Sequence, residues 1–117
     1  MTDYLADYSY FTSKEDIDSA AKQHRTLNSR TMHQTDRDVL DMIRRDSIRF
    51  GAAHLKHDTI ADEIGKSNAT VRRSIRKLEK LGIIDRIHYI RPVMSGLGAN
   101  IYVIKPYTLG GNGYKFE

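Results

Sequence analysis

Two short helices separated by a glycine turn are the feature that most constrains how this chain can fold. Residues 57–64 predict the first helix and residues 67–81 the second, because apolar residues recur at helical spacing in both. The inward positions are Ile60, Ala61 and Ile64 in the first helix and Val71, Ile75 and Leu78 in the second. Gly65 suits a C-terminal cap with positive φ, and Ser67 suits the N-cap of the next helix. Helices joined this closely are typical of a helix-turn-helix.

The second helix is basic on the side opposite its apolar stripe. On a helical wheel of about 100° per residue, that side carries Ala69, Arg73, Arg76, Lys77 and Lys80, with Arg72 on the flank. Residues 66–91 carry eight Lys or Arg against two Asp or Glu, in a chain whose net charge is +4. A solvated helix face explains most charge runs, but a compact positive patch also attracts a phosphate backbone. Charge alone leaves both explanations open.

The start of this helix adds short hydrogen-bonding side chains to the positive face. The major groove of DNA admits a helix, Arg can donate paired hydrogen bonds to guanine, and Lys mainly neutralises phosphates. Ser67, Asn68 and Thr70 are suited to phosphate or base-edge contacts. We therefore predict a surface for double-stranded DNA on this helix. Its members are Lys66, Ser67, Asn68, Thr70, Arg72, Arg73, Arg76, Lys77 and Lys80.

After Gly82 the pattern changes to strands. Residues 83–90 and 100–104 are rich in β-branched residues, and a stretch with one proline and two glycines separates them. Three helices followed by such a hairpin are the order of a winged helix. The expected fold class is therefore mainly α with a small β-hairpin. The tip of this wing has no Lys or Arg, so we assign backbone contacts to its base, at Arg86, His88 and Arg91.

Two further helices are predicted before this motif. Thr35 can cap a helix from Asp36 to about Asp46, with Arg44 and Arg45 in its last turn and a buried stripe formed by Val39, Leu40, Met42 and Ile43. Ser13 can cap a weaker helix from Lys14 to Leu27. Its stripe is thin and consists of Ile17, Ala20, Ala21 and Leu27, so it needs another surface to cover it.

These elements divide the chain into four expected parts. A tail of residues 1–12 precedes the N-terminal helix and linker of residues 13–34. The winged helix-turn-helix domain follows over residues 35–106, with a possible short strand at Ala53–Leu55, and residues 107–117 form a second tail. The aromatic side chains of the first tail could either dock on the body or stay loose.

The motif also carries a family resemblance. The stretch TIADEIGKSNATVRRSIRKLEKLGII, residues 59–84, resembles the signature of bacterial winged helix-turn-helix DNA-binding proteins. It is similar in particular to small proteins of Gram-positive bacteria, their phages and plasmids, which serve as transcription regulators or as the DNA-binding part of replication initiators. The resemblance covers roughly residues 35–105. It implies a recognition helix at residues 67–80, a wing at residues 91–100, and DNA contacts by Thr70 and Arg73.

Other chemistry finds little support in the residues. The chain has no cysteine, and no phosphate loop, nucleophile elbow or catalytic triad is recognisable, so we expect neither an enzyme nor a cofactor. A metal site at His54, His57, Asp58 and Asp62 is disfavoured because a structural zinc site usually has a fuller set of ligands. His24 and His33 are interpreted as surface residues. Without a secretory signal or membrane anchor, the expected location is the cytoplasm, on a bacterial nucleoid.

Two classes of function remain open at this point. The first is a sequence-specific DNA-binding protein, either a transcription regulator or a component of replication initiation. The second is a winged helix that docks on a protein without DNA contact; an exposed apolar face would favour it, and the basic face does not. Since one helix reads only a few base pairs, we expect a homodimer through the N-terminal helix, with a monomer as the alternative. The tails could recruit a protein partner.

Overall fold

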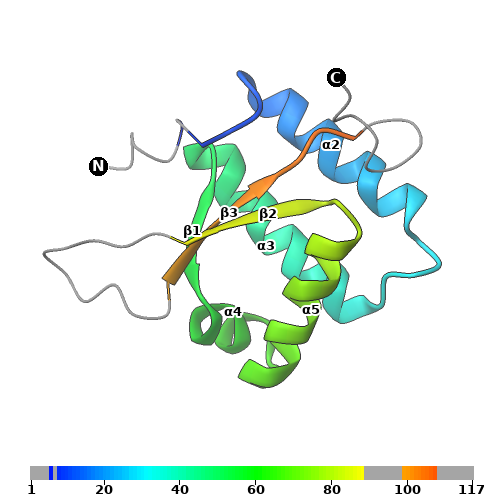
Figure 1. Ribbon diagram of the computed structural model, residues 1–117, viewed down its shortest axis with the longest axis vertical. Coiled ribbons are helices and arrows are strands. Elements are labelled where there is room, and N and C mark those ends of the chain that lie inside the picture. Colours follow the sequence, from blue (N-terminus) through cyan, green and yellow to red (C-terminus); the bar gives the residue numbers. More distant parts are fainter. Residues whose placement is uncertain (1–5, 7, 89–98, 108–117) are drawn as a thin grey trace, which may run out of the picture.

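Four helices lie against a small antiparallel sheet in the computed structural model, which describes residues 6, 8–88 and 99–107 (Figure 1). The elements in chain order are α2 (Lys14–Leu27), α3 (Gln34–Phe50), β1 (Ala53–Lys56), α4 (His57–Ile64), α5 (Asn68–Lys80), β2 (Ile84–His88) and β3 (Ala99–Ile104). The expected winged-helix order is confirmed. None of the described helices is long and apolar enough to cross a membrane.

The sheet has three strands in the order β1-β3-β2, one more than the expected hairpin. Strand β3 pairs with β2 through Arg86 opposite Tyr102, and on its other edge with β1 through His54 opposite Ile101. The short strand expected near Ala53–Leu55 is therefore real. It joins the sheet because Ala53 and Leu55 are buried, so that pairing also satisfies the backbone groups beside them. Residues 89–98, which include most of the expected wing loop, lie outside the described residues.

The two faces of the sheet are covered by different parts of the chain. Tyr102 and Ile104 belong to the main core, which the helices complete with Val39, Ile43, Ile75 and Leu78 among others. On the other face, Ile101 and Val103 pack with Tyr8 from the N-terminal segment. The hydroxyl of Tyr10 donates a hydrogen bond to Asp85 of β2 at 2.5 Å. The N-terminal segment therefore docks on the body, which decides between the two alternatives left open above for Tyr8 and Tyr10.

The helix caps expected around the helix-turn-helix are confirmed. The Ser67 hydroxyl accepts a hydrogen bond from the backbone N–H of Thr70 at 3.1 Å, and Gly65 ends α4 with φ 72°. The Ser13 hydroxyl accepts from the N–H of Asp16 at 3.1 Å at the start of α2. These signals are local, so the sequence specifies them without tertiary contacts.

Both expected ends of α3 are wrong. The helix begins at Gln34 rather than after Thr35, because the carboxylate of Asp36 accepts the N–H of His33 at 2.9 Å and secures an earlier turn. It continues beyond Asp46 to Phe50 because Ser47 faces the interior, and it ends at Gly51 with φ 96°. Arg44 and Arg45 consequently lie before the last turn, where both pair with Asp41 instead of the helix end.

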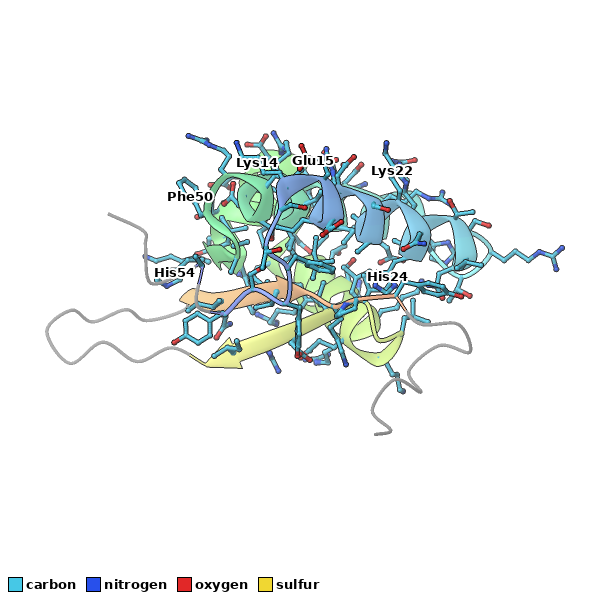
Figure 2. All side chains as sticks on the ribbon, turned by 90° about the horizontal axis from the view of Figure 1, so that it is seen from above. Lys14, Glu15, Lys22, His24, Phe50 and His54 are labelled. Carbon is cyan, nitrogen blue, oxygen red and sulfur yellow. The ribbon has the colours of Figure 1, made fainter. Side chains whose placement is uncertain are left out.

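The face that α2 buries also differs from the prediction. Ile17, Ala20 and Ala21 are buried as expected, but Leu27 is 57% exposed and His24 is only 4% exposed. His24 continues the buried stripe at helical spacing, and its Nε2 lies 2.7 Å from the carbonyl oxygen of Lys105, which meets its polar requirement. Burial lowers the pKa of His24, although the Lys105 carbonyl opposes this shift. Figure 2 shows Glu15 and Lys22 on the outer side of α2.

The packing of α2 changes the argument about assembly. Helix α2 lies against α3 and β3 of its own chain, which cover its apolar stripe. A second copy is therefore not needed to bury Ile17, Ala20 and Ala21. The reason for placing a homodimer contact on this helix no longer holds, while the homodimer itself stays a prediction.

Candidate nucleic-acid interface

Helix α5 is divided sharply into a buried side and a charged side. Val71, Ile75 and Leu78 are at most 1% exposed and hold the helix against the core. Arg72, Arg73, Arg76 and Lys80 are exposed on the remaining surface. In Figure 1, α4 and α5 lie together at the end of the molecule away from α2. The core therefore fixes a helix whose outer surface is almost entirely cationic.

The predicted basic residues fall into two groups by their ion pairs. Within the described part of the chain, no carboxylate pairs with Lys66, Arg72, Arg73, Arg76 or Lys80. Lys77 pairs with Asp36, and Arg86 pairs with Glu79 at 3.5 Å. The first group has its charge available for an anion. The second group has part of its charge neutralised within the protein.

Lys77 departs most from the outward position that the helical wheel assigned to it. Its ammonium nitrogen lies 2.7 Å from Asp36, a carboxylate that is only 6% exposed, and the Ser74 hydroxyl donates to the same carboxylate at 2.6 Å. Burial alone would raise the pKa of Asp36. The hydrogen bonds from Lys77, Ser74 and the His33 N–H outweigh burial and hold that pKa below its usual value. Lys77 thus joins α5 to the start of α3.

The first turn of α5 is ordered by its own hydrogen bonds. The Ser67 hydroxyl donates to the Thr70 hydroxyl at 2.9 Å, and the Asn68 amide donates to Asp58 of α4 at 2.5 Å. The Asn68 carbonyl oxygen accepts from Arg72. Ser67 is exposed, whereas Asn68 and Thr70 are half-buried. Asn68 therefore links α4 to α5, which the prediction of a simple DNA contact did not include.

His57, interpreted from the sequence only as a possible metal ligand, lies near arginines of α5 and β2. His57 is the first residue of α4, and its Nε2 is buried with no hydrogen-bond partner among the described residues. Burial lowers the pKa of His57, as do the charges of Arg72, Arg86 and Arg76, while Asp58 opposes them. The sequence does place a His at the first position of the first helix of the motif. A charge there interacts with the helix dipole, and this pattern could have drawn attention to His57.

Among the described residues, no three His, Asp or Glu side chains group closely enough to hold a metal ion.

The predicted site residues after α5 lie on or beyond β2. Arg86 is exposed on β2, where it lies opposite Tyr102 in the register and close to α5 through its ion pair with Glu79. The backbone of His88 ends β2, but its side chain and the whole of Arg91 lie outside the described residues. The structure therefore brings ten of the twelve predicted site residues to α5, its N-terminal turn and the adjoining strand.

Comparison with known proteins agrees with this geometry. Residues 32–85 match the family described as winged helix-turn-helix DNA-binding. The match begins just before α3 and ends within β2, so it includes the whole of α4 and α5. No curated protein and no solved structure matches the chain. Residues 32–85 are therefore similar to the winged helix-turn-helix DNA-binding family, and the structure has the winged-helix fold of that family.

Proposed function

We propose that this protein regulates transcription by binding specific sites in double-stranded DNA with α5 in the major groove. The single observation that carries the proposal is the exposed cationic surface of α5, where Arg72, Arg73, Arg76 and Lys80 have no carboxylate partner within the described part of the chain. DNA phosphates can therefore pair with these cationic side chains without breaking an existing ion pair. The core contacts of α5 hold the helix rigidly enough to define a register on the groove.

Base reading is assigned to the outward arginines of α5. Arg73 lies near the N-terminal turn that enters the groove in helix-turn-helix proteins, and its guanidinium hydrogen bonds only weakly to Thr70, at 3.4 Å. A guanine could replace that contact with paired hydrogen bonds to O6 and N7. Lys66 and Lys80, at the two ends of the helix, are assigned to phosphates. Arg86, together with His88 and Arg91, is assigned to the phosphates of the DNA backbone beside the strands.

A docking module without DNA contact is the weaker alternative. Such a module would present apolar side chains on the free face of α5. The large apolar residues of this helix, Val71, Ile75 and Leu78, are all buried. Its exposed apolar residue is the small Ala69. The chemistry of the surface therefore favours a polyanion over an apolar protein surface. A role in replication initiation would use the same interface, so the location of the bound sites has to separate it from transcription regulation.

The decisive experiment combines binding with site identification. Selection from a randomised duplex library, followed by genome-wide mapping of bound sites, should return one short motif. Enrichment upstream of genes supports transcription regulation, whereas enrichment at replication origins supports the initiator role. Absence of duplex binding at low salt would reject both. A mass measurement of the protein with and without a selected duplex shows whether two copies occupy paired half-sites about one helical turn apart.

A further inference from the structure

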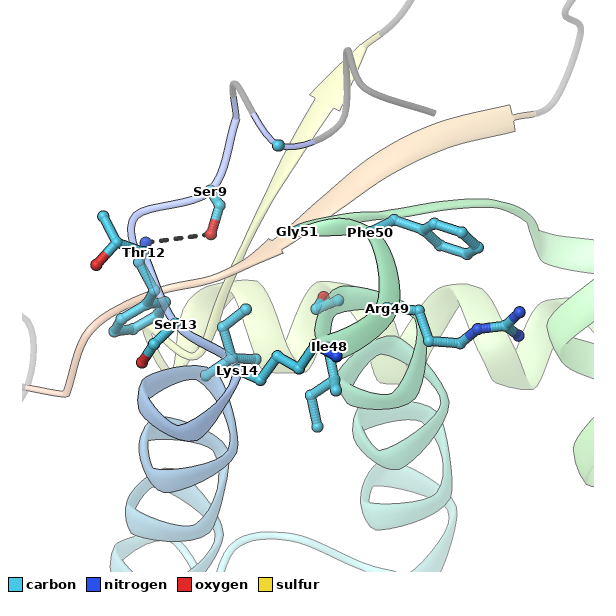
Figure 3. A pocket seen from close by; sticks show the side chains of 12 residues that line it. Ser9, Thr12, Ser13, Lys14, Ile48, Arg49, Phe50 and Gly51 are labelled. Atoms are coloured by element: carbon cyan, nitrogen blue, oxygen red, sulfur yellow. Dashed lines mark hydrogen bonds between the residues drawn. The ribbon is translucent and has the colours of Figure 1, made fainter. Parts of the chain in front are cut away.

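A cavity far from α5 lies between the N-terminal segment, the start of α2 and the end of α3 (Figure 3). Its volume is about 320 Å³, within the range of about 300–1,000 Å³ that is usual for small-molecule sites. Its described lining includes no residue of α4 or α5. The proposed DNA interface therefore makes no use of this cavity.

The wall of the cavity combines hydroxyl groups, two cationic residues and an apolar surface. Ser9, Thr12 and Ser13 bring hydroxyls, and Phe11, Ile17 and Ile48 bring apolar surface. Figure 3 shows the Lys14 side chain extending from the first turn of α2 toward Ile48. No Asp or Glu is found in the described lining. A negatively charged group would meet a cation and hydroxyl donors there, without a carboxylate facing it.

Ser47 is the polar side chain of the lining whose hydrogen-bonding capacity is not met by the described residues. It is 1% exposed, it lines the cavity, and its Oγ has no hydrogen-bond partner among the described residues. A buried hydroxyl without a partner destabilises the folded state, so such groups usually have a partner that completes them. A bound acceptor at this position would supply the partner that the described protein atoms do not.

The start of α2 adds a second contribution of the same sign. The first backbone N–H groups of a helix have no partner within the helix, and the helix dipole makes this end partially positive. Ser13 caps only the N–H of Asp16. The cavity thus lies beside the positive end of a 14-residue helix, next to Lys14 and across from Ser47.

We propose that this cavity binds a small organic anion, with its carboxylate or phosphate between Lys14 and Ser47. Its apolar body packs against Phe11, Ile17 and Ile48. The other cation of the lining is Arg49, whose guanidinium lies 5.0 Å from the centre of the Phe50 ring and is directed away from the cavity in Figure 3. Lys14 is therefore the cation that recognises the acid group. The site is independent of the DNA interface, so either assignment can fail without the other.

Thermal unfolding of the full chain in the presence of simple probes tests the site. At constant ionic strength, benzoate and phenyl phosphate should each raise Tm with increasing concentration, because a ligand that binds only the folded state stabilises it. Benzylamine, which has the same ring and the opposite charge, should not. The acid that raises Tm more identifies which group the site prefers. Equal stabilisation by inorganic phosphate would overturn the organic part of the proposal.

Matched variants show whether the effect belongs to this cavity. Ser47→Ala and Lys14→Met should abolish the rise in Tm caused by the anions. Lys22→Met, on the exposed side of the same helix, should retain it. Arg73→Ala should also retain it, which separates this site from anion binding at α5. Stabilisation that persists in Ser47→Ala and Lys14→Met, or an absence of stabilisation by any anion, overturns the proposal.

The unliganded Ser47→Ala protein provides an independent readout. A serine whose hydroxyl supports the fold loses stability when it becomes alanine. The Ser47 hydroxyl is buried without a partner, so its removal should leave Tm unchanged or raise it while anion binding is lost. A clear decrease in Tm of the unliganded variant would show that Ser47 is structural and would overturn its assignment to a ligand.

Discussion

The ammonium nitrogen of Lys77 lies 2.7 Å from the carboxylate of Asp36, so one of the cations of α5 is engaged inside the protein. Asp36 is buried and also accepts hydrogen bonds from Ser74 and from the backbone N–H of His33. Through its ion pair with Lys77 and its hydrogen bond from Ser74, this carboxylate connects the start of α3 to α5. The orientation of the proposed recognition helix therefore depends on a buried carboxylate of α3.

The salt dependence of DNA binding should separate Lys77 from Lys80. Each phosphate contact contributes about 0.9 to the slope of log affinity against log salt concentration. Lys80→Met should reduce this slope by about 0.9 because Lys80 is exposed and unpaired within the described chain. Lys77→Met should leave the slope unchanged while lowering stability. Fluorescence anisotropy across a salt titration measures both, and a reduced slope in Lys77→Met would place that ammonium on a phosphate instead.

The stability contributed by Asp36 should depend on pH in a defined direction. Its pKa in the folded state is lowered by Lys77, Ser74 and His33 in spite of burial. A lowered pKa stabilises the folded protein above the unfolded value of about 3.9, and this contribution disappears as pH falls through the lower folded pKa. Asp36→Asn should therefore be less stable at pH 7, by roughly 1–3 kcal/mol for an unsatisfied buried partner.

Chemical denaturation at several pH values checks this prediction. The difference in the free energy of unfolding between the natural protein and Asp36→Asn should narrow below about pH 4. Asp38→Asn is a suitable control, because Asp38 lies in the same first turns of α3 and hydrogen bonds only to Gln34 in the described structure. A difference that stays constant from pH 7 to pH 2.5 would mean that the charge of Asp36 does not stabilise the fold.

Local signals made much of this architecture predictable, and tertiary contacts explain what was missed. Ser67 and Gly65 set the bounds of α5 and α4 through the backbone of their own turns, so neighbouring residues were sufficient to find them. His24 is buried only because the Lys105 carbonyl, 81 residues away in sequence, lies beside it. Lys77 is half-buried and paired because α3 places the carboxylate of Asp36 next to it. A helical wheel describes one helix alone, so it shows neither the Lys105 carbonyl nor Asp36.

Arg73 should read a base, whereas Lys80 should only position the protein. Arg73→Ala is expected to cost about 1–3 kcal/mol on the preferred site and to relax the preference at one base position. Lys80→Ala should weaken binding to all sequences about equally. Competition binding against duplexes that differ at single positions distinguishes these outcomes. Equal, sequence-independent losses in both variants would assign base reading to another residue of α5.

His57 should make DNA binding tighter as pH falls. In the free protein its pKa is lowered by burial and by the charges of Arg72, Arg86 and Arg76. Phosphates that neutralise those arginines remove part of this effect, so the pKa of His57 should be higher in the complex than in the free protein. A group whose pKa rises on binding takes up a proton, and affinity then increases as pH falls through the pKa of His57 in the complex.

Affinity measured between pH 5.5 and pH 8 tests this linkage directly. The natural protein should bind more tightly at the acidic end, and His57→Gln should show a flatter profile with the same salt slope at pH 8, where His57 is neutral in both states. His54→Gln provides the matched control, because His54 lies on β1 and is absent from the groups that shift the pKa of His57. Identical pH profiles for the natural protein and His57→Gln would show that the bound phosphates do not approach Arg72, Arg76 and Arg86 closely enough to be sensed at His57.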